Sequence, residues 1–243
     1  LTAQMMNEST LNKSSEDISV ALQKLGSTVN FNSDGDITTL YIESLTENFS
    51  QTLSIVKEKL FSPAFNDEDF KRVKKTNSEG LESMKKNSQY LASTTMGKVL
   101  FGDTPYGNSM SKKNLKKIKL KDIQEYYNTY SPNVSELVAV GNISKDEFYS
   151  QLDFLKKWEN KNVNLPSNFE FPPDNTTQIY LLDKEGASQS YIMMGHKSNS
   201  YDVDGEFFKS QIMNKSLGGG ASGRLFLNLR EDKGYTHGAY SFF

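Results

Sequence analysis

The stretch LGGGASGRLFLNLREDKGYTHGAYS, residues 217–241, combines a glycine run, a short helix and an aromatic-rich segment. The three consecutive glycines Gly218–Gly220 leave the backbone free to adopt positive φ angles. Ser222 is expected to cap the helix that follows, and Lys233-Gly234 gives it the basic last turn and the glycine that are typical of a helix end. Residues 235–243 are rich in aromatic side chains, which favours a strand. The stretch therefore predicts a glycine loop, then a helix, then a strand.

The chain before this stretch alternates between helical and strand patterns. Residues 27–33 and 37–45 alternate in polarity around Asp34-Gly35-Asp36, which predicts a β-hairpin. Apolar residues at helical spacing predict helices over 1–7, 14–25, 46–60, 66–86, 88–101, 120–130, 144–158 and 206–217. Short apolar runs predict further strands over 136–141, 178–183 and 190–196. This mixture predicts an α+β fold in which helices cover a largely antiparallel sheet.

Residues 159–176 separate two parts of the chain. The segment contains three prolines, is rich in asparagine and has no apolar periodicity, so it is expected to be a linker. It divides the chain into a domain at 1–158 and a second, similar α+β domain that begins at 177 and is truncated at 243. Because the chain starts at Leu1 and stops inside a predicted strand, we expect it to be a fragment of a longer protein.

Composition excludes several kinds of site. The formal net charge of −2 argues against a general nucleic-acid binder, since phosphate binding needs a basic field. The absence of cysteine excludes disulfides, thiolate metal sites and a cysteine nucleophile. No apolar run approaches the length of about 20 residues that a transmembrane helix needs. A basic run is better interpreted as a solvated loop and helix than as a nucleic-acid site: Lys112, Lys113, Lys116, Lys117, Lys119 and Lys121.

The run at 217–241 resembles the second-domain signature of the insulinase/pitrilysin family of zinc metallopeptidases, which includes the mitochondrial processing peptidase. Segments upstream are also similar to that family: SEDISVALQKLGS, FSPAFNDEDFKRVK, PYG and LVAVGNIS. The similarity covers nearly the whole chain. It implies tandem, similar α+β domains, each with a largely antiparallel sheet packed against helices.

The zinc site of that family does not survive in this sequence. The resemblance places the inverted motif H-x-x-E-H on the opening helix, with Ala3 at the glutamate position, Gln4 at the second histidine position and the first histidine position before Leu1. The third ligand position falls on Gly80, one residue from Glu79. Alanine cannot act as a base and glutamine is a poor zinc ligand. We therefore expect no catalytic residue, no metal ligand and no zinc in this chain.

A substrate-contacting role is what the resemblance implies for the stretch at 217–241. In the family, an arginine in this helix and a tyrosine seven residues later hold the peptide near the zinc, which lies on another domain. Arg230 matches the arginine, whereas His237 stands at the tyrosine position, with Tyr235 two residues early. His237 either donates a hydrogen bond to substrate or has simply drifted, and Arg230 either contacts substrate or pairs with a neighbouring acid. The glycines Gly218, Gly219 and Gly220 would let substrate approach the backbone.

Two other features offer alternative interpretations. The glycines at 218, 220 and 223 satisfy G-x-G-x-x-G, but a dinucleotide fingerprint needs a strand before the loop, and a helix is predicted there. His196, the other of the two histidines, is interpreted as a half-exposed residue at the end of a strand.

Two functional hypotheses follow. In the first, the chain is the non-catalytic, substrate-gripping half of an insulinase-type peptidase, and a zinc-bearing half lies in the same polypeptide or on another subunit. In the second, the chain is a structural or docking protein with the same fold and no proteolytic role. The resemblance also implies a peptide substrate, and it suggests the periplasm because bacterial relatives are often exported there.

Overall fold

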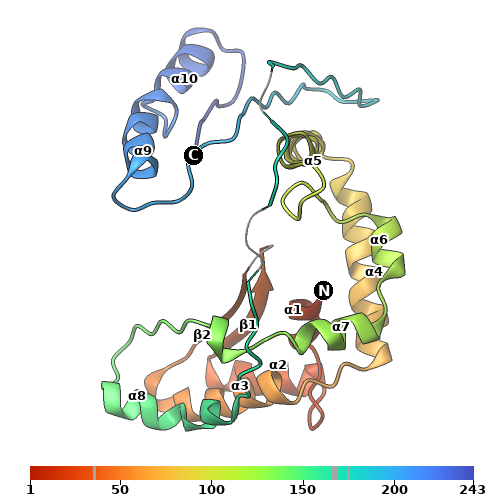
Figure 1. Ribbon diagram of the computed structural model, residues 1–243, viewed down its shortest axis with the longest axis vertical. Helices are drawn as coiled ribbons and strands as arrows, with labels where there is room; N and C mark the ends of the chain where they lie inside the picture. The colour runs from red at the N-terminus through yellow and green to blue at the C-terminus, as the bar shows by residue number, and fades with distance from the viewer. Residues whose placement is uncertain (35–36, 166–168, 174–175) are drawn as a thin grey trace. The chain divides into compact units, whose positions relative to one another are not determined.

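The computed structural model describes residues 1–34, 37–165, 169–173 and 176–243. The chain forms two compact units (Figure 1). The first comprises Leu1–Pro172 with Ile179–Ile192, and the second comprises Pro173–Gln178 with Met193–Phe243.

A two-stranded antiparallel sheet lies in the first unit. Strand β1 (Thr28–Ser33) pairs with β2 (Thr38–Glu43) in a register that sets Phe31 opposite Leu40. The predicted hairpin is confirmed on both sides of its turn, whose residues 35–36 lie outside the described part of the chain. The side chains of β1 alternate in burial, so one face of the hairpin contributes Val29 and Phe31 to the core.

The helices of the first unit largely follow the sequence patterns. Ser14 caps α2 through a capping box, and Gly26 ends it in the left-handed conformation. The bounds are α1 (Thr2–Met6), α2 (Ser15–Leu25), α3 (Phe49–Phe61), α4 (Asp67–Met84), α5 (Ser88–Phe101), α6 (Lys112–Lys117), α7 (Leu120–Tyr127) and α8 (Lys145–Gln151). Short 3₁₀ turns lie at η1 (Thr46–Asn48), η2 (Pro132–Val134) and η3 (Asp153–Lys157). The predicted helix over 144–158 is thus divided into α8 and η3.

The short helix α1 is enclosed by the rest of the first unit. Met5 and Met6 are each 1% exposed and pack with Phe31, Val73 and Ile123 from β1, α4 and α7. A second cluster forms around Val29, Leu53 and Val56, where α3 covers the sheet. The first cluster fixes α1, which carries positions of the family's zinc motif, between the hairpin and the helix α4.

Two polar contacts lock the end of α1. The Asn7 carboxamide donates to the Phe31 carbonyl and accepts from the Phe31 amide, both at 2.8 Å, as a neighbouring strand would. The Lys59 ammonium, on α3, is 2% exposed and donates to the carbonyls of Met6 at 3.4 Å and Asn7 at 2.7 Å. Desolvation by burial lowers the pKa of Lys59 to about 8, against an opposing contribution from Glu8. The end of α1 therefore depends on a buried cation.

The second unit contains α9 (Glu206–Leu217), α10 (Arg224–Phe226) and a π-helical turn, η4 (Leu227–Asp232). The predicted cap at Ser222 is wrong, because Gly223 is the N-cap residue and supplies no side-chain hydrogen bond. A helix, α9, precedes the glycine run. A dinucleotide fingerprint needs a strand at that place, so this glycine spacing is not one.

Four strand predictions are wrong in this structure. The segments 136–141, 178–183, 190–196 and 235–243 have no ladder partner among the described residues. The turn between the second and third of them is nevertheless formed: the Ala187 amide donates to the Lys184 carbonyl at 3.2 Å, and Gly186 has φ +70°. The segments are extended but lack the pairing that defines a sheet.

The α+β class is confirmed, with helices and an antiparallel sheet in the first unit. Within the described residues, no helix is long and apolar enough to cross a membrane.

Candidate substrate-contacting site

Arg230 lies on the π-helical turn η4, with its guanidinium over an aromatic ring. Its Cζ is 5.1 Å from the centroid of the Phe226 ring, four residues earlier in the chain. Its Nε lies 3.6 Å from a carboxylate oxygen of Glu231, and its side chain is 46% exposed. Pairing with a neighbouring acid, one of the two alternatives for Arg230, is therefore present. The contact is loose and faces solvent, so it leaves guanidinium N–H groups for a ligand.

Phe226 holds the guanidinium because it is itself fixed. It is 7% exposed, and its ring centroid lies 5.6 Å from that of Tyr240. Tyr240 in turn folds over Gly238, where an added Cβ would lie 2.7 Å from the tyrosine ring. A π-helical turn of this kind is rare in proteins and is frequent at functional sites. Arg230, Phe226 and Tyr240 form an ordered stack at the surface of the second unit.

The glycine run has a structural reason at two of its three positions. A Cβ on Gly218 would lie 2.5 Å from Ser241 Oγ and 2.7 Å from its amide nitrogen. A Cβ on Gly219 would lie 3.0 Å from the Cα of Lys215, whereas one on Gly220 would meet only the Lys215 ammonium at 3.6 Å. Gly218 and Gly219 therefore allow close packing of the backbone, and Gly220 alone is sterically open.

A buried asparagine ties the glycine run to the end of the chain. Asn214, 5% exposed, donates from Nδ2 to the Ser241 carbonyl at 2.8 Å and accepts from the Ser241 hydroxyl. The Ser241 amide donates to the Gly218 carbonyl at 3.1 Å. The sequence analysis missed Asn214 and Phe226. The spacing of four residues between Phe226 and Arg230 was the available signal for the second of these.

His237 is exposed and lies outside any helix or strand. Within the described part of the chain, no hydrogen bond or ring contact joins it to Arg230. Tyr235, the other candidate for the tyrosine position, is 77% exposed, and the Lys233 ammonium lies 6.0 Å from its ring centroid. The structure brings Arg230 together with Phe226, but it does not bring His237 to the guanidinium.

The positions of the family's catalytic glutamate and of two of its zinc ligands are filled by residues that fit neither role. Ala3 is buried and carries no carboxylate. Gln4 Oε1 accepts a hydrogen bond from Asn77 Nδ2 at 2.9 Å, and the same nitrogen donates to the Val73 carbonyl at 2.8 Å. A Cβ on Gly80 would meet nothing within 4 Å. A pair of neutral amides thus connects α1 with α4 where a zinc site would need anionic and imidazole ligands.

Metal ligands do not gather elsewhere in the described chain. Among those residues no group of three His, Cys, Asp or Glu could hold an ion. His196 is exposed, and its Nδ1 lies 2.6 Å from the Lys197 carbonyl.

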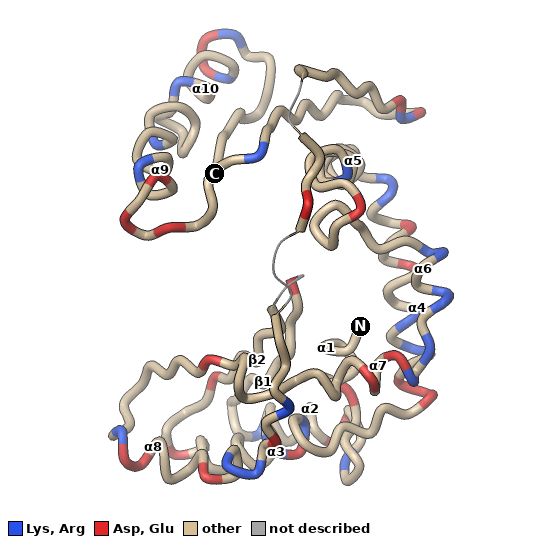
Figure 2. Tube along the Cα trace, in the orientation of Figure 1, with Lys and Arg blue, Asp and Glu red and all other residues tan. Residues whose placement is uncertain are grey.

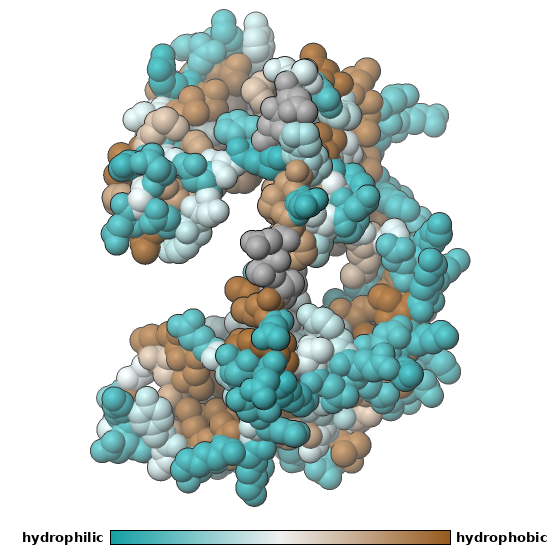
Figure 3. Space-filling model, viewed as in Figure 1, coloured by the Kyte–Doolittle hydropathy of each residue, from teal (hydrophilic) through white to brown (hydrophobic). Residues whose placement is uncertain are grey.

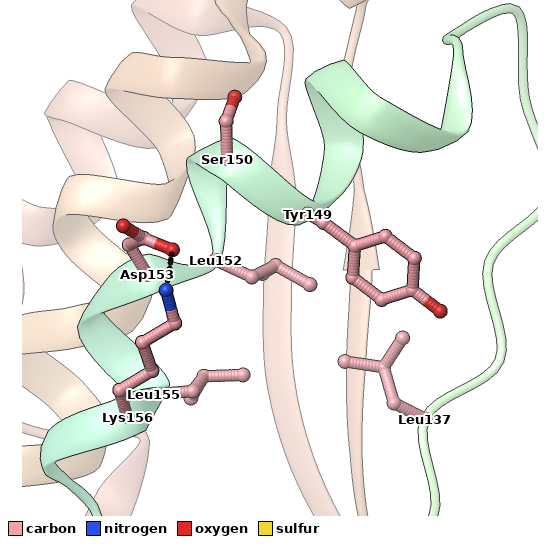
Figure 4. Close-up of a pocket in the computed structure, with 7 residues that line it drawn as sticks. All are labelled: Leu137, Tyr149, Ser150, Leu152, Asp153, Leu155 and Lys156. Carbon is pink, nitrogen blue, oxygen red and sulfur yellow. Dashed lines mark ion pairs between the residues drawn. The ribbon is translucent and has the colours of Figure 1, made fainter.

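One shallow hollow of about 570 Å³ lies in the first unit, where Leu137 faces Tyr149, Leu152 and Leu155 (Figure 4). Lys156 and Asp153, an ion pair with 2.7 Å between Nζ and Oδ1, close one side of it. The rest of its lining is apolar except for two hydroxyls, those of Tyr149 and Ser150. The Asp153 carboxylate is engaged by Lys156, and no histidine lines the hollow beside Ser150, so the lining does not show the paired nucleophile and base that a catalytic site needs.

Comparison with known proteins identifies the family. The family described as "Peptidase M16 inactive domain" matches residues 117–243, and "Insulinase (Peptidase family M16)" matches residues 1–114. The chain is 25% identical to "Non-peptidase homolog YmxG" of Helicobacter pylori over 99% of its own length and 56% of the relative's. It is 24% identical to "Uncharacterized zinc protease YmxG" of Bacillus subtilis over 98% of its length and 58% of the relative's.

A third relative, "Probable inactive metalloprotease YmfF" of Bacillus subtilis, is 20% identical over 83% of this chain and 49% of its own. The chain spans about half the length of these relatives.

Solved structures share the fold. The crystal structure of a peptidase M16 inactive domain from Pseudomonas fluorescens superimposes with a TM-score of 0.78 at 21% identity, covering all of this chain and 60% of the other. The crystal structure of a protease from Helicobacter pylori gives a TM-score of 0.84 at 16% identity, covering 99% of this chain and 60% of the other. Matches to the family cover both ends of the sequence, and the positions of the zinc motif hold Ala3, Gln4 and Gly80. The chain therefore belongs to the insulinase family of peptidases, peptidase family M16.

Proposed function

We propose that the chain is the substrate-gripping, non-catalytic half of an insulinase-type peptidase and acts together with a zinc-bearing half. The observation that carries this proposal is the exposed guanidinium of Arg230, held 5.1 Å from the Phe226 ring centroid on a π-helical turn. A guanidinium has five N–H donors in a planar fork, which suits the carbonyl oxygens of an extended peptide. The family match supports a pairing of this kind, because the residues at the zinc positions cannot perform hydrolysis.

We assign the other residues the roles that the family resemblance implies. His237, exposed at the tyrosine position, donates a second hydrogen bond to the peptide. In the run Gly218–Gly220, the substrate approaches the backbone at Gly220, where the space beside Cα is open. Gly218 and Gly219 allow the close packing that sets the conformation of the loop. The catalytic zinc belongs to the partner half. We also propose the division into domains at 1–158 and 177–243 with a linker at 159–176, and a periplasmic location.

The test is peptide hydrolysis by a mixture of this chain with a zinc-bearing member of the family. We expect Arg230→Ala to lower kcat/KM by roughly tenfold to a few hundredfold, the loss of one or two charged hydrogen bonds. Arg230→Lys should recover only part of the loss, because an ammonium lacks the planar fork. A folded Arg230→Ala variant with native activity would contradict the gripping role.

A structural or docking role without proteolysis is the second candidate. The departure at His237 and the contact of Arg230 with Glu231 favour it, because both fit residues released from substrate binding. In that case the chain would bind its partner half while none of the substitutions at 230 or 237 changed the rate of peptide hydrolysis.

A further inference from the structure

The basic residues of this acidic protein are concentrated in one part of the chain. Residues 71–121 contain 13 of the 28 lysines and arginines but only 3 of the 30 aspartates and glutamates. This segment thus has a formal charge of +10, and the rest of the chain has −12. The segment forms the greater part of α4, all of α5 and α6, and the connections between them.

These lysines share a surface because α4 and α6 lie side by side (Figure 2). Lys74 of α4 donates from Nζ to the carbonyls of Lys116 at 3.3 Å and Ile118 at 2.7 Å. At the other end, Lys112 pairs with Glu82 at 2.8 Å. On α6 the only buried side chain is Leu115, so the lysines of this short helix face solvent, and the surface over α6 is hydrophilic (Figure 3).

Most of this charge is not neutralised within the chain. The three acids of the segment are already engaged: Glu79 with Lys75, Glu82 with Lys85 and Lys112, and Asp103 with Lys98. Six exposed lysines have no ion pair among the described residues, and we name them the lysine face: Lys71, Lys86, Lys113, Lys116, Lys117 and Lys119. Six like charges on one surface repel one another, so binding of an anionic surface to the lysine face relieves this repulsion and is favourable.

The composition of the lysine face identifies the kind of partner. The single arginine of the segment, Arg72, already pairs with Glu8 at 2.7 Å and with Asp69, so the cations of the lysine face are all ammonium groups, which do not read a base or a phosphate bidentately. Protein interfaces are depleted in lysine and enriched in arginine and aromatic residues. Clusters of lysines, in contrast, bind the diffuse charge of anionic lipid headgroups.

Two exposed methionines flank the lysine face. Met84 is 51% exposed and precedes Lys85 and Lys86, and Met110 is 43% exposed and lies just before α6. The ion pair between Glu82 and Lys112 connects these two segments. Flexible apolar side chains beside basic ones are typical of surfaces that lie on a bilayer, where the apolar groups enter the headgroup region.

We propose that the lysine face, together with Met84 and Met110, docks the protein on an anionic lipid surface. Binding is electrostatic and peripheral, and it does not involve the stack of Arg230, Phe226 and Tyr240. It therefore stands independently of the proposed peptidase function.

The experiment is co-sedimentation of the full chain with vesicles of phosphatidylcholine alone or with about 30 mol % phosphatidylserine, at about 0.05 M and about 0.5 M NaCl. We expect binding only to the anionic vesicles and only at low salt, because salt screens exposed charges. Neutralising four lysines (Lys113→Gln, Lys116→Gln, Lys117→Gln and Lys119→Gln) should weaken the binding on the order of several hundredfold, about fivefold for each charge.

The matched control neutralises four exposed lysines elsewhere, Lys24→Gln, Lys57→Gln, Lys157→Gln and Lys161→Gln, and so reaches the same net charge. This control should keep its binding within a few fold, and both variants should melt at the native temperature. Equal loss in the two variants, binding to neutral vesicles, or no binding to anionic ones overturns the proposal. So does tighter binding of a single-stranded oligonucleotide, or low-salt self-association that only the first variant abolishes, since either would assign the face to another partner.

Discussion

The guanidinium of Arg230 rests on the ring of Phe226, with 5.1 Å between Cζ and the ring centroid. The two residues are four apart across the boundary between α10 and the π-helical turn η4. Because Phe226 is buried and is packed against Tyr240 at 5.6 Å, the ring gives a fixed platform to a side chain that would otherwise sample many rotamers. The exposed cation is thereby supported from one side by a fixed ring.

We predict that Phe226→Leu lowers kcat/KM of the reconstituted peptidase through Arg230. Leucine keeps the core filled but offers no π face. The guanidinium therefore loses the cation–π interaction that orients it, which is worth about 0.5–1 kcal/mol. The expected loss is roughly twofold to fivefold, and it should vanish in an Arg230→Ala background. Steady-state kinetics of the double-mutant cycle measure this coupling, and additive losses would mean that Phe226 acts only on stability.

Substitutions at His237 distinguish the two candidate functions, because only the substrate-gripping role needs a hydrogen-bond donor at this position. His237→Tyr should match or exceed the native activity, since a phenol restores the residue of the family, and His237→Phe should be worse than tyrosine because it lacks a donor. The measurement is kcat/KM beside the melting temperature of each variant. Indistinguishable tyrosine and phenylalanine variants would remove His237 from the substrate site.

Alanine substitutions along the glycine run should differ sharply in stability. Gly218→Ala places Cβ 2.5 Å from Ser241 Oγ and should cost about 1–3 kcal/mol, the usual cost of overpacking. Gly220→Ala is the matched control: Cβ meets only the Lys215 ammonium at 3.6 Å, and the change should stay within about 0.5 kcal/mol or stabilise slightly. Urea unfolding measures both. Equal losses would show that the close approach of Ser241 does not exist in solution.

Burial of Lys59 predicts a pH dependence of stability. The unfolded chain keeps the proton up to the ordinary pKa of 10.5, whereas the folded chain releases it at about 8, so between these values the unfolded state binds more protons. The free energy of unfolding therefore rises with pH between 8 and 10.5, on the order of 3 kcal/mol, relative to a Lys59→Met variant. Below pH 8 the difference between the two should be flat.

The control for Lys59 is Lys57→Met, because Lys57 lies on the same helix but is exposed, so its charge is not desolvated. Its stability should follow that of the native chain across the whole range. A Lys59→Met difference that does not change with pH would mean that water reaches the ammonium in solution.

We predict that the purified chain holds no stoichiometric zinc. Gln4 is bound to Asn77 at 2.9 Å and Ala3 offers no ligand atom, so α1 and α4 cannot supply the family's set. Elemental analysis after dialysis measures the metal content, and Asn77→Ala, which breaks the amide pair, should not raise it. Near-stoichiometric zinc in either protein would contradict the assignment.

The linker at residues 159–176 should be cut first by a broad-specificity protease, because it has no apolar periodicity. On one side, Lys161 and Val163 bind the side chains of Ser131 and Asn133 at 2.9 and 3.3 Å. On the other side, Phe169 packs on Tyr106, with 5.6 Å between ring centroids. Anchored backbone resists proteolysis, so cuts next to Lys161, Val163 and Phe169 should be slow. First cuts between Ser14 and Phe101 would contradict the proposed domains.

The amino-acid sequence alone determined the family and the loss of the metal site, because both depend on the identity of residues at fixed spacing. Ala3 cannot act as a base, Gly80 has no side-chain ligand atom and Gln4 is a poor zinc ligand, whatever the fold. Local signals also located α5 at its observed bounds and ended α2 at Gly26, since caps and helical periodicity act within a few residues.

Tertiary structure decided what depends on contacts between distant residues. Segments such as 136–141 are extended, as their apolar pattern predicts, but a strand also needs a partner across a ladder, which a local pattern does not contain. The burial of Lys59 under α1 and the approach of Ser241 to Gly218 join residues 52 and 23 apart in sequence, and only the packed chain brings them together. Likewise, the sequence predicted a role for Arg230, but only the structure showed that its guanidinium lies over the buried ring of Phe226.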